Sequence, residues 1–173
     1  MKLLKTEKLN DNNFDAYGWT VRRPERALDV ENDQLAYWDN MADLSNFTGN
    51  GILGFLEVKK VPIRMEMMDL LTESLRLYLS VDGKPSVQFV ALNDSASNGP
   101  DLDTLKAFLL EDGDGVVIRE NVWHWTPYAL TETAGFVMGL KNDIMKSEGG
   151  TYTVDDTKVK YFTLPEAVGV DLG

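Results

Sequence analysis

Short apolar runs that alternate with turn signals recur from residue 51 to the end of the chain, and this pattern constrains the fold most strongly. Segments rich in Asp, Asn, Gly and Pro, such as 82–85, 93–100 and 111–115, separate the runs. No long helical pattern intervenes, which favours a sandwich or a barrel over an α/β sheet. We therefore predict an all-β chain with strands at 52–60, 63–69, 75–81, 87–92, 106–110, 116–119, 122–130, 135–140 and 159–164.

The segments outside this pattern are less regular. Residues 1–9 are compatible with a first strand, and the polar cluster at 10–13 predicts a turn that caps a short helical segment. Residues 27–50 are polar, with scattered aromatics and no clean period, so we expect a long, partly helical connection there. A short terminal helix is predicted at 165–168.

Length and charge limit the classes of function. With 173 residues and 43% hydrophobic content the chain can bury a core, and we expect a single domain over residues 1–173. The lack of cysteine excludes thiolate catalysis and cysteine zinc sites. A net charge of -11 argues against nucleic acid and anionic membranes as partners, because both require clustered cations. The charged N-terminus and the lack of a long apolar run favour a cytoplasmic protein.

His124 is the only histidine in the chain, so any histidine chemistry depends on it. It lies in the stretch from Gly113 to Pro127, which is typical of a short apolar strand, a turn at Asn121 and a second strand that begins at Val122. Asparagine suits this turn because it tolerates positive φ angles better than most residues that carry a Cβ.

The spacing within this stretch resembles the second motif of the cupin barrels, G-x5-P-x-G-x2-H. Gly113 and His124 stand at its two ends. Arg119 takes the place of the usual proline, and Asn121 takes the place of the second glycine.

The surrounding sequence resembles one cupin family more closely. Three segments match in order the DLxTLRAF...G...NVWHHP signature of the ureidoglycolate lyases, a family that this sequence therefore resembles: DLDTLKAF at 101–108, Gly115, and NVWH at 121–124. These lyases act in allantoin breakdown. The resemblance runs from about residue 14 to 140 and is clearest over residues 75–128. It implies a cupin-type double-stranded β-helix, or jelly-roll barrel, with a few short helices.

Cupins commonly hold a metal through a first motif, G-x5-H-x-H-x3,4-E-x6-G, in which lyase relatives replace the glutamate with glutamine. Counting back from Gly83 aligns Arg76 with that glutamate, Leu71 with the second histidine and Asp69 with the first. A protonated arginine and a leucine do not ligate a dication, so Asp69 and His124 remain, fewer than a catalytic zinc site requires. We therefore predict no metal and no cofactor. A shifted alignment would offer two other carboxylates, Glu66 and Glu73.

The strand predicted at 75–81 alternates leucines with polar residues, so that Arg76, Tyr78 and Ser80 share one face. If this face lines the barrel mouth, Arg76 can bind a carboxylate through two hydrogen bonds while Tyr78 and Ser80 supply hydroxyls. Alternatively the leucines fill the barrel and Arg76 faces solvent, and periodicity alone does not distinguish these orientations. The alignment to the first cupin motif favours the inward one.

Two interpretations of His124 are open. A lone histidine between tryptophans is commonly a structural side chain hydrogen-bonded in a core, whereas the family resemblance implies a catalytic one. Trp123 and Trp125 alternate with His124, so we expect them to pack on the opposite face of the strand. Thr126 and Tyr128 are expected on the face of His124, which makes Tyr128 a further candidate for substrate binding.

The resemblance implies elimination of urea from ureidoglycolate to give glyoxylate. His124 would act as general base or acid, because an imidazole titrates near neutrality. Arg76 would anchor the substrate carboxylate, and Asp69 would orient a group or exchange a proton. The alternative is a non-catalytic or differently specific cupin that binds a small carboxylate or a sugar. We expect a small anionic substrate as partner and, as in similar cupins, a homodimer.

Overall fold

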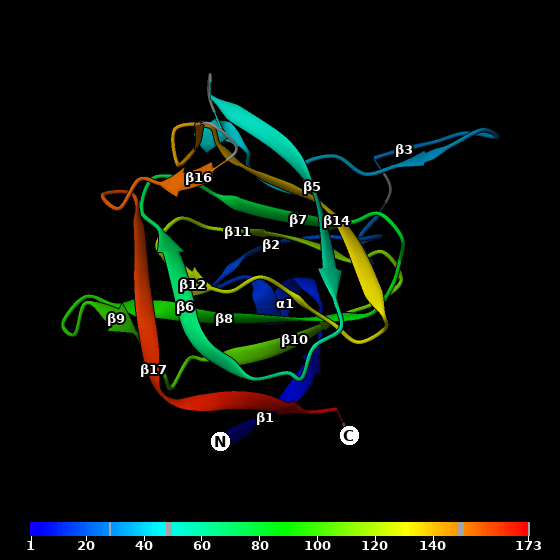
Figure 1. The fold of residues 1–173 in the computed structure, drawn as a ribbon. Coiled ribbons are helices and arrows are strands. Elements are labelled where there is room, and N and C mark those ends of the chain that lie inside the picture. Colours follow the sequence, from blue (N-terminus) through cyan, green and yellow to red (C-terminus); the bar gives the residue numbers. More distant parts are fainter. Residues whose placement is uncertain (28, 48–49, 149–150, 173) are drawn as a thin grey trace.

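The computed structural model describes residues 1–27, 29–47, 50–148 and 151–172, and it is built almost entirely of strands (Figure 1). The larger of its two main sheets has eight strands, in the order β10-β1-β17-β6-β12-β8-β13, with β9 paired to β8. These strands are β1 (Lys2–Lys8), β6 (Met65–Leu71), β8 (Ser86–Asp94), β9 (Gly99–Pro100), β10 (Lys106–Leu110), β12 (Val122–His124), β13 (Tyr128–Ala129) and β17 (Val159–Asp171).

The second main sheet has five strands, in the order β2-β11-β7-β14-β5, and faces the first. They are β2 (Gly18–Val21), β5 (Gly51–Lys59), β7 (Arg76–Ser80), β11 (Gly115–Ile118) and β14 (Thr133–Lys141). Two hairpins stand apart from both sheets. One pairs β3 (Val30–Glu31) with β4 (Ala36–Tyr37), and the other pairs β15 (Met145–Glu148) with β16 (Thr151–Val154).

The larger sheet closes on itself. Besides its linear order, β10 also pairs with β8, so six strands form a ring through β10, β1, β17, β6, β12 and β8. The pairings of β1 with β10 and with β17 are parallel, and the other pairings in the ring are antiparallel. Closure removes free edges from these strands. The two facing main sheets, together with the strand content, confirm the predicted all-β, cupin-type barrel with few helical turns.

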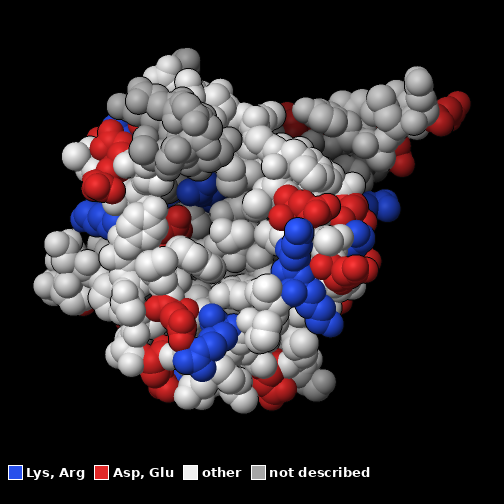
Figure 2. Space-filling view, in the orientation of Figure 1, with Lys and Arg blue, Asp and Glu red and all other residues white. Residues whose placement is uncertain are grey.

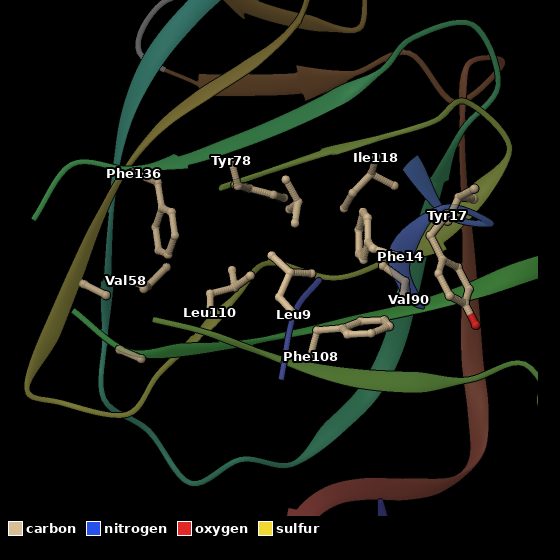
Figure 3. Close-up of a cluster of buried hydrophobic side chains, with 14 residues drawn as sticks. Leu9, Phe14, Tyr17, Val58, Tyr78, Val90, Phe108, Leu110, Ile118 and Phe136 are labelled. Atoms are coloured by element: carbon tan, nitrogen blue, oxygen red, sulfur yellow. The ribbon is translucent and has the colours of Figure 1, made fainter. Parts of the chain in front are cut away.

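The first hydrophobic core lies between the two main sheets (Figure 3). Its side chains come from both sheets and from the N-terminal segment, and they point toward one another across the barrel. Phe14, Tyr17 and Phe108 meet edge-to-face or tilted at centroid distances of 5.2 to 5.9 Å, which adds directional aromatic contacts to the burial of apolar area.

A second hydrophobic core lies on the other face of the larger sheet, within the ring. It is formed largely by the alternate residues of the same strands, for example Phe89 beside Val90 on β8 and Trp123 beside Val122 on β12. Both faces of β8 and β12 are therefore buried, which explains why 87–92 is apolar at nearly every position instead of alternating with polar residues.

Several local predictions are confirmed. Asn10 caps α1 (Asp11–Phe14), because its side chain accepts hydrogen bonds from two backbone N–H groups while Asn13 bonds back to the backbone of Asn10. Asn121 has φ 61°, as expected at the turn before β12. The connection at 27–50 holds the β3–β4 hairpin and one turn of 3-10 helix, η1 (Ser45–Phe47), so its helical part is small.

Two predictions of secondary structure are wrong. Residues 165–168 form no helix but continue β17, and the register of β17 against β6 shifts between Thr163 and Val168. Pro165 is tolerated there because a bulge does not require its missing N–H group. The strand predicted at 122–130 ends at His124 and resumes as β13 beyond Pro127, whose ring interrupts the ladder.

Among the described residues, no helix is long and apolar enough to cross a membrane.

Candidate functional site

The strand β12 holds His124 inside the barrel. Its neighbour Trp123 is buried in the second core, where its Nε1 donates a hydrogen bond of 2.9 Å to Asn93 Oδ1 and its ring meets Phe162 edge-on. The backbone N–H of Asn121 donates to Leu71 O at 2.8 Å, which ties the start of this strand to β6. Because side chains alternate along a strand, fixing Trp123 on one face directs His124 to the other. Trp123 and Trp125 both pack in the second core, as the alternation predicts.

Asp69 is the cross-strand neighbour of His124. The two residues are paired in register between β6 and β12, and Asp69 Oδ1 lies 3.4 Å from His124 Nε2. The other ring nitrogen, Nδ1, lies 2.9 Å from Val122 O. A carbonyl only accepts hydrogen bonds, so Nδ1 carries the proton, and in the neutral ring Nε2 has a free lone pair. Neither Nε2 nor Asp69 Oδ1 has a hydrogen-bond partner among the described residues.

Arg76 reaches the same point from the opposite sheet. It lies on β7 and is buried, and Tyr78 on the same face belongs to the core between the sheets, so the polar face of this strand points inward. Its Nη2 lies 3.7 Å from Asp69 Oδ2, and its Nη1 contacts Met138 Sδ at 3.4 Å. Its Nε has no hydrogen-bond partner among the described residues. This buried guanidinium therefore has donors to spare for an anion.

The electrostatic environment keeps His124 neutral. Burial lowers the pKa of the imidazole, because the charged form loses its hydration. The negative charge of Asp69 raises this pKa and the positive charge of Arg76 lowers it, and burial has the largest effect. At neutral pH the ring therefore presents Nε2 as a base.

Tyr78 belongs to the same group of residues. It is buried on the inner face two residues beyond Arg76, and its pKa is raised first by burial and also by the charge of Asp69, while Arg76 lowers it. A side-chain hydrogen bond between Tyr78 and Thr126 has a smaller effect and lowers this pKa. The phenol is therefore protonated at neutral pH and can act as a donor within the barrel.

The structure does not bring the other two substrate-binding candidates to this point. Ser80 lies about 13 Å along β7 from Arg76, and its Oγ accepts a hydrogen bond of 3.1 Å from the backbone N–H of Gly83 at the following turn. Tyr128 packs in the second core against Phe89, on the side of the sheet opposite His124. The expectation that Tyr128 shares the face of His124 is wrong, because the strand between them is interrupted.

An apolar wall adjoins the polar group. Leu71 lies two residues from Asp69 on β6 and packs with Leu140, Ile144 and Val159, with Met138 against them. Figure 2 shows a basic and an acidic group side by side in a recess of a surface that is largely uncharged around them. A small ligand at this position would meet charge on one side and apolar surface on the other.

Two neighbours of the site were not expected from the sequence. Met138 of β14 contacts Arg76, and Tyr161 of β17 is paired in register with Asp69. No motif marks either residue, and only the pairing of β17 with β6 brings the end of the chain to the barrel mouth.

Comparison with known proteins supports the family resemblance of the sequence motif around His124. The family model described as ureidoglycolate lyase matches residues 1–158. The chain belongs to the ureidoglycolate lyase family. Curated relatives in this family include ureidoglycolate lyases of Salmonella typhimurium and Salmonella paratyphi B, each 25% identical over 138 residues, which are 78% of this chain and 84% of the relative. Among solved structures, RmlC from Streptococcus suis in complex with dTDP-D-xylose is similar with a TM-score of 0.41 and 10% identity, over 54% of this chain and 44% of that chain.

The residues at the site of this family member do not suit the metal found in many cupins. Of the four positions aligned with metal ligands in other cupins, only Asp69 and His124 offer lone pairs, and the guanidinium of Arg76 lies beside them. A positive charge at this distance repels a dication even at an effective dielectric constant of about 20. Within the described ranges, no three His, Cys, Asp or Glu side chains gather closely enough to hold a metal ion.

We predict that the purified protein, prepared without a histidine tag, contains no stoichiometric transition metal. Elemental analysis by mass spectrometry is the measurement. About one zinc, manganese, iron or nickel per chain that is lost in His124→Ala would show that the first motif is aligned wrongly.

We also predict that the imidazole of His124 titrates below the ordinary histidine pKa of about 6.5. The chain has one histidine, so its ring nitrogens can be followed by NMR without assignment. Arg76→Met should raise this pKa by removing a positive charge, and Asp69→Asn should lower it. Because the unfolded chain binds the proton more tightly, this contribution to stability is present above about pH 6.5 and is lost as pH falls below it. A pKa above 6.5 in the wild type would contradict the arrangement described.

Proposed function

We propose that this protein is a ureidoglycolate lyase that acts on ureidoglycolate in the cytoplasm, releasing urea and glyoxylate. The observation that carries the proposal is the group of buried Arg76, buried His124 and half-buried Asp69, in which each side chain has a buried polar atom without a hydrogen-bond partner among the described residues. Buried polar groups of this kind are costly unless a ligand engages them. Membership of the family supplies the reaction.

Arg76 binds the carboxylate of the substrate in this proposal. Its guanidinium is buried against an apolar wall, where a charge-assisted pair of hydrogen bonds is stronger than in water. The same residue aligns with the position at which lyase relatives have glutamine. This chain thus has a charged side chain where lyase relatives have a neutral one, and the carboxylate of Asp69 offsets part of the positive charge of Arg76.

His124 moves the proton in the elimination. Its Nε2 removes the proton from the substrate hydroxyl, the C–N bond breaks as the C=O bond of glyoxylate forms, and the proton passes to the departing urea nitrogen. The protonated ring is stabilised by the carboxylate of Asp69 at 3.4 Å, while Nδ1 stays bonded to Val122 O. No proton is gained or lost overall, so one base that receives and returns a proton is sufficient.

The proposal predicts turnover that depends on these side chains. Wild-type protein should release urea and glyoxylate in equal amounts. His124→Ala should lower kcat by about 10² to 10⁴, the usual contribution of a general base. Arg76→Met should raise KM by about 10- to 150-fold, because hydrogen bonds to a charged group are lost. Arg23→Met, at an exposed arginine, serves as the matched control and should leave both constants unchanged.

Lack of turnover by folded wild-type protein would overturn the lyase assignment. If that protein still bound glycolate through Arg76, the alternative of a non-catalytic or differently specific cupin that binds a small carboxylate would take its place.

We further propose that two copies of the chain pair through the edge strand β5. Its far side has no partner strand among the described residues. Leu53 and Phe55 of β5 are each 71% exposed, and Val81 is 50% exposed. Phe55 and Val81 both lie over Gly135, so these side chains form one apolar stripe on the outer face of the five-stranded sheet. Antiparallel pairing of two β5 strands about a two-fold axis would satisfy the free edges and bring the two stripes together.

Light scattering after size-exclusion chromatography should therefore give twice the mass of one chain at micromolar concentration. Phe55→Asp should shift the mass toward that of a single chain, because it places a charge in the stripe. Leu35→Asp, at an exposed leucine outside both main sheets, is the matched control and should stay dimeric. A wild-type monomer, or a Phe55→Asp dimer of unchanged stability to dilution, would contradict this interface.

A further inference from the structure

Tyr161 stands in line with the two residues at the centre of the site. It is paired in register with Asp69 between β17 and β6, and Asp69 is paired with His124 between β6 and β12. Residues directly opposite one another in adjacent strands place their side chains on the same face. The side chains of Tyr161, Asp69 and His124 therefore form a row across the inner face of the larger sheet.

The row runs from the interior to the rim. The side chains of His124, Arg76 and Asp69 are 1%, 8% and 17% exposed, whereas Tyr161 is 50% exposed. A ligand whose carboxylate lies on Arg76 has its anionic end in the interior, so the rest of the ligand extends outward past Asp69. Tyr161 is the member of the row that this outer end reaches.

The distances suit a small ligand. Strands β12 and β17 are two strand spacings apart, or about 10 Å, so the phenol does not contact His124 directly. A molecule of a few heavy atoms above Asp69 would touch both. Within the described residues no hydrogen bond is formed by the hydroxyl of Tyr161. Burial and the charge of Asp69 raise the pKa of this phenol while Arg76 lowers it, so the hydroxyl is protonated and able to donate at neutral pH.

Tyr161 also lies beyond the part of the chain that the family model matches. That match ends at residue 158, and β17 begins at Val159. The role inferred below for Tyr161 therefore rests on the geometry of this chain and not on the family match.

We infer that Tyr161 is a substrate-binding residue that recognises the ureido end of the substrate, donating a hydrogen bond from its phenol to the ureido carbonyl oxygen. This inference rests on the proposed function for the identity of the substrate. It makes Arg76 responsible for the carboxylate in the interior and Tyr161 responsible for the neutral, outer end. Ligands that have the carboxylate but lack the ureido group should not depend on Tyr161.

Two stable probes separate these ends. N-carbamoylglycine has the carboxylate and the ureido group but no hydroxyl on the reacting carbon, and glycolate has the carboxylate and hydroxyl but no ureido group. Binding of each is measured by titration calorimetry to wild type, Tyr161→Phe and Tyr37→Phe. Tyr37 is 52% exposed on β4 and is the matched control.

Tyr161→Phe should weaken N-carbamoylglycine by about three- to tenfold, the range for one hydrogen bond between uncharged partners. It should leave glycolate within about twofold, and Tyr37→Phe should change neither. Equal weakening of both probes, no weakening of either, or no binding of N-carbamoylglycine by the wild type would each overturn the inference.

The turnover assay distinguishes this inference from the proposed function. If wild type binds N-carbamoylglycine through Tyr161 but does not turn over ureidoglycolate, the inference stands and the lyase assignment falls. If wild type turns over ureidoglycolate and Tyr161→Phe has an unchanged KM, the lyase assignment stands and the role of Tyr161 falls.

Discussion

Strand β12 is buried on both faces, and the position of the site depends on this. Trp123 occupies the core within the ring of strands, and His124 points into the barrel between the two main sheets. A shift of one residue in register would exchange the two, placing a large indole among the polar groups and an imidazole among methionines and leucines. The indole hydrogen bond to Asn93 and the backbone bond from Asn121 to Leu71 O oppose such a shift.

The polar group inside the barrel lowers the stability of the fold, because few hydrogen bonds compensate for its burial. The guanidinium of Arg76 is 3.7 Å from Asp69, too far for a good hydrogen bond, and its Nη1 contacts the thioether of Met138. A barrel selected for stability alone would have an apolar residue here, as it does at Leu71 on β6 of the facing sheet. Functional sites commonly retain side chains that lower the stability of the fold, and this polar group fits that pattern.

Much of this fold follows from the sequence because its signals are local. The strand periods, the cap at Asn10 and the turn at Asn121 each depend on residues within a few positions of one another. The failures share a cause too. The sequence predicts a helix at 165–168, but the pairing of β17 with both β1 and β6 outweighs that local preference, and the proline is accommodated at a bulge. Alternation of side chains would place Tyr128 on the inner face only if the strand predicted at 122–130 were unbroken.

Most strands of the two main sheets, the single histidine with its family motif, and the polar face shared by Arg76 and Tyr78 follow from the sequence. Tertiary structure alone decided which way that face points, because alternation defines two faces without saying which one is covered by the second sheet. It alone also brought Asp69 and Tyr161 into one row with His124. These residues are far apart in the sequence. The pairing of β6 with both β12 and β17, which no local pattern encodes, makes them neighbours.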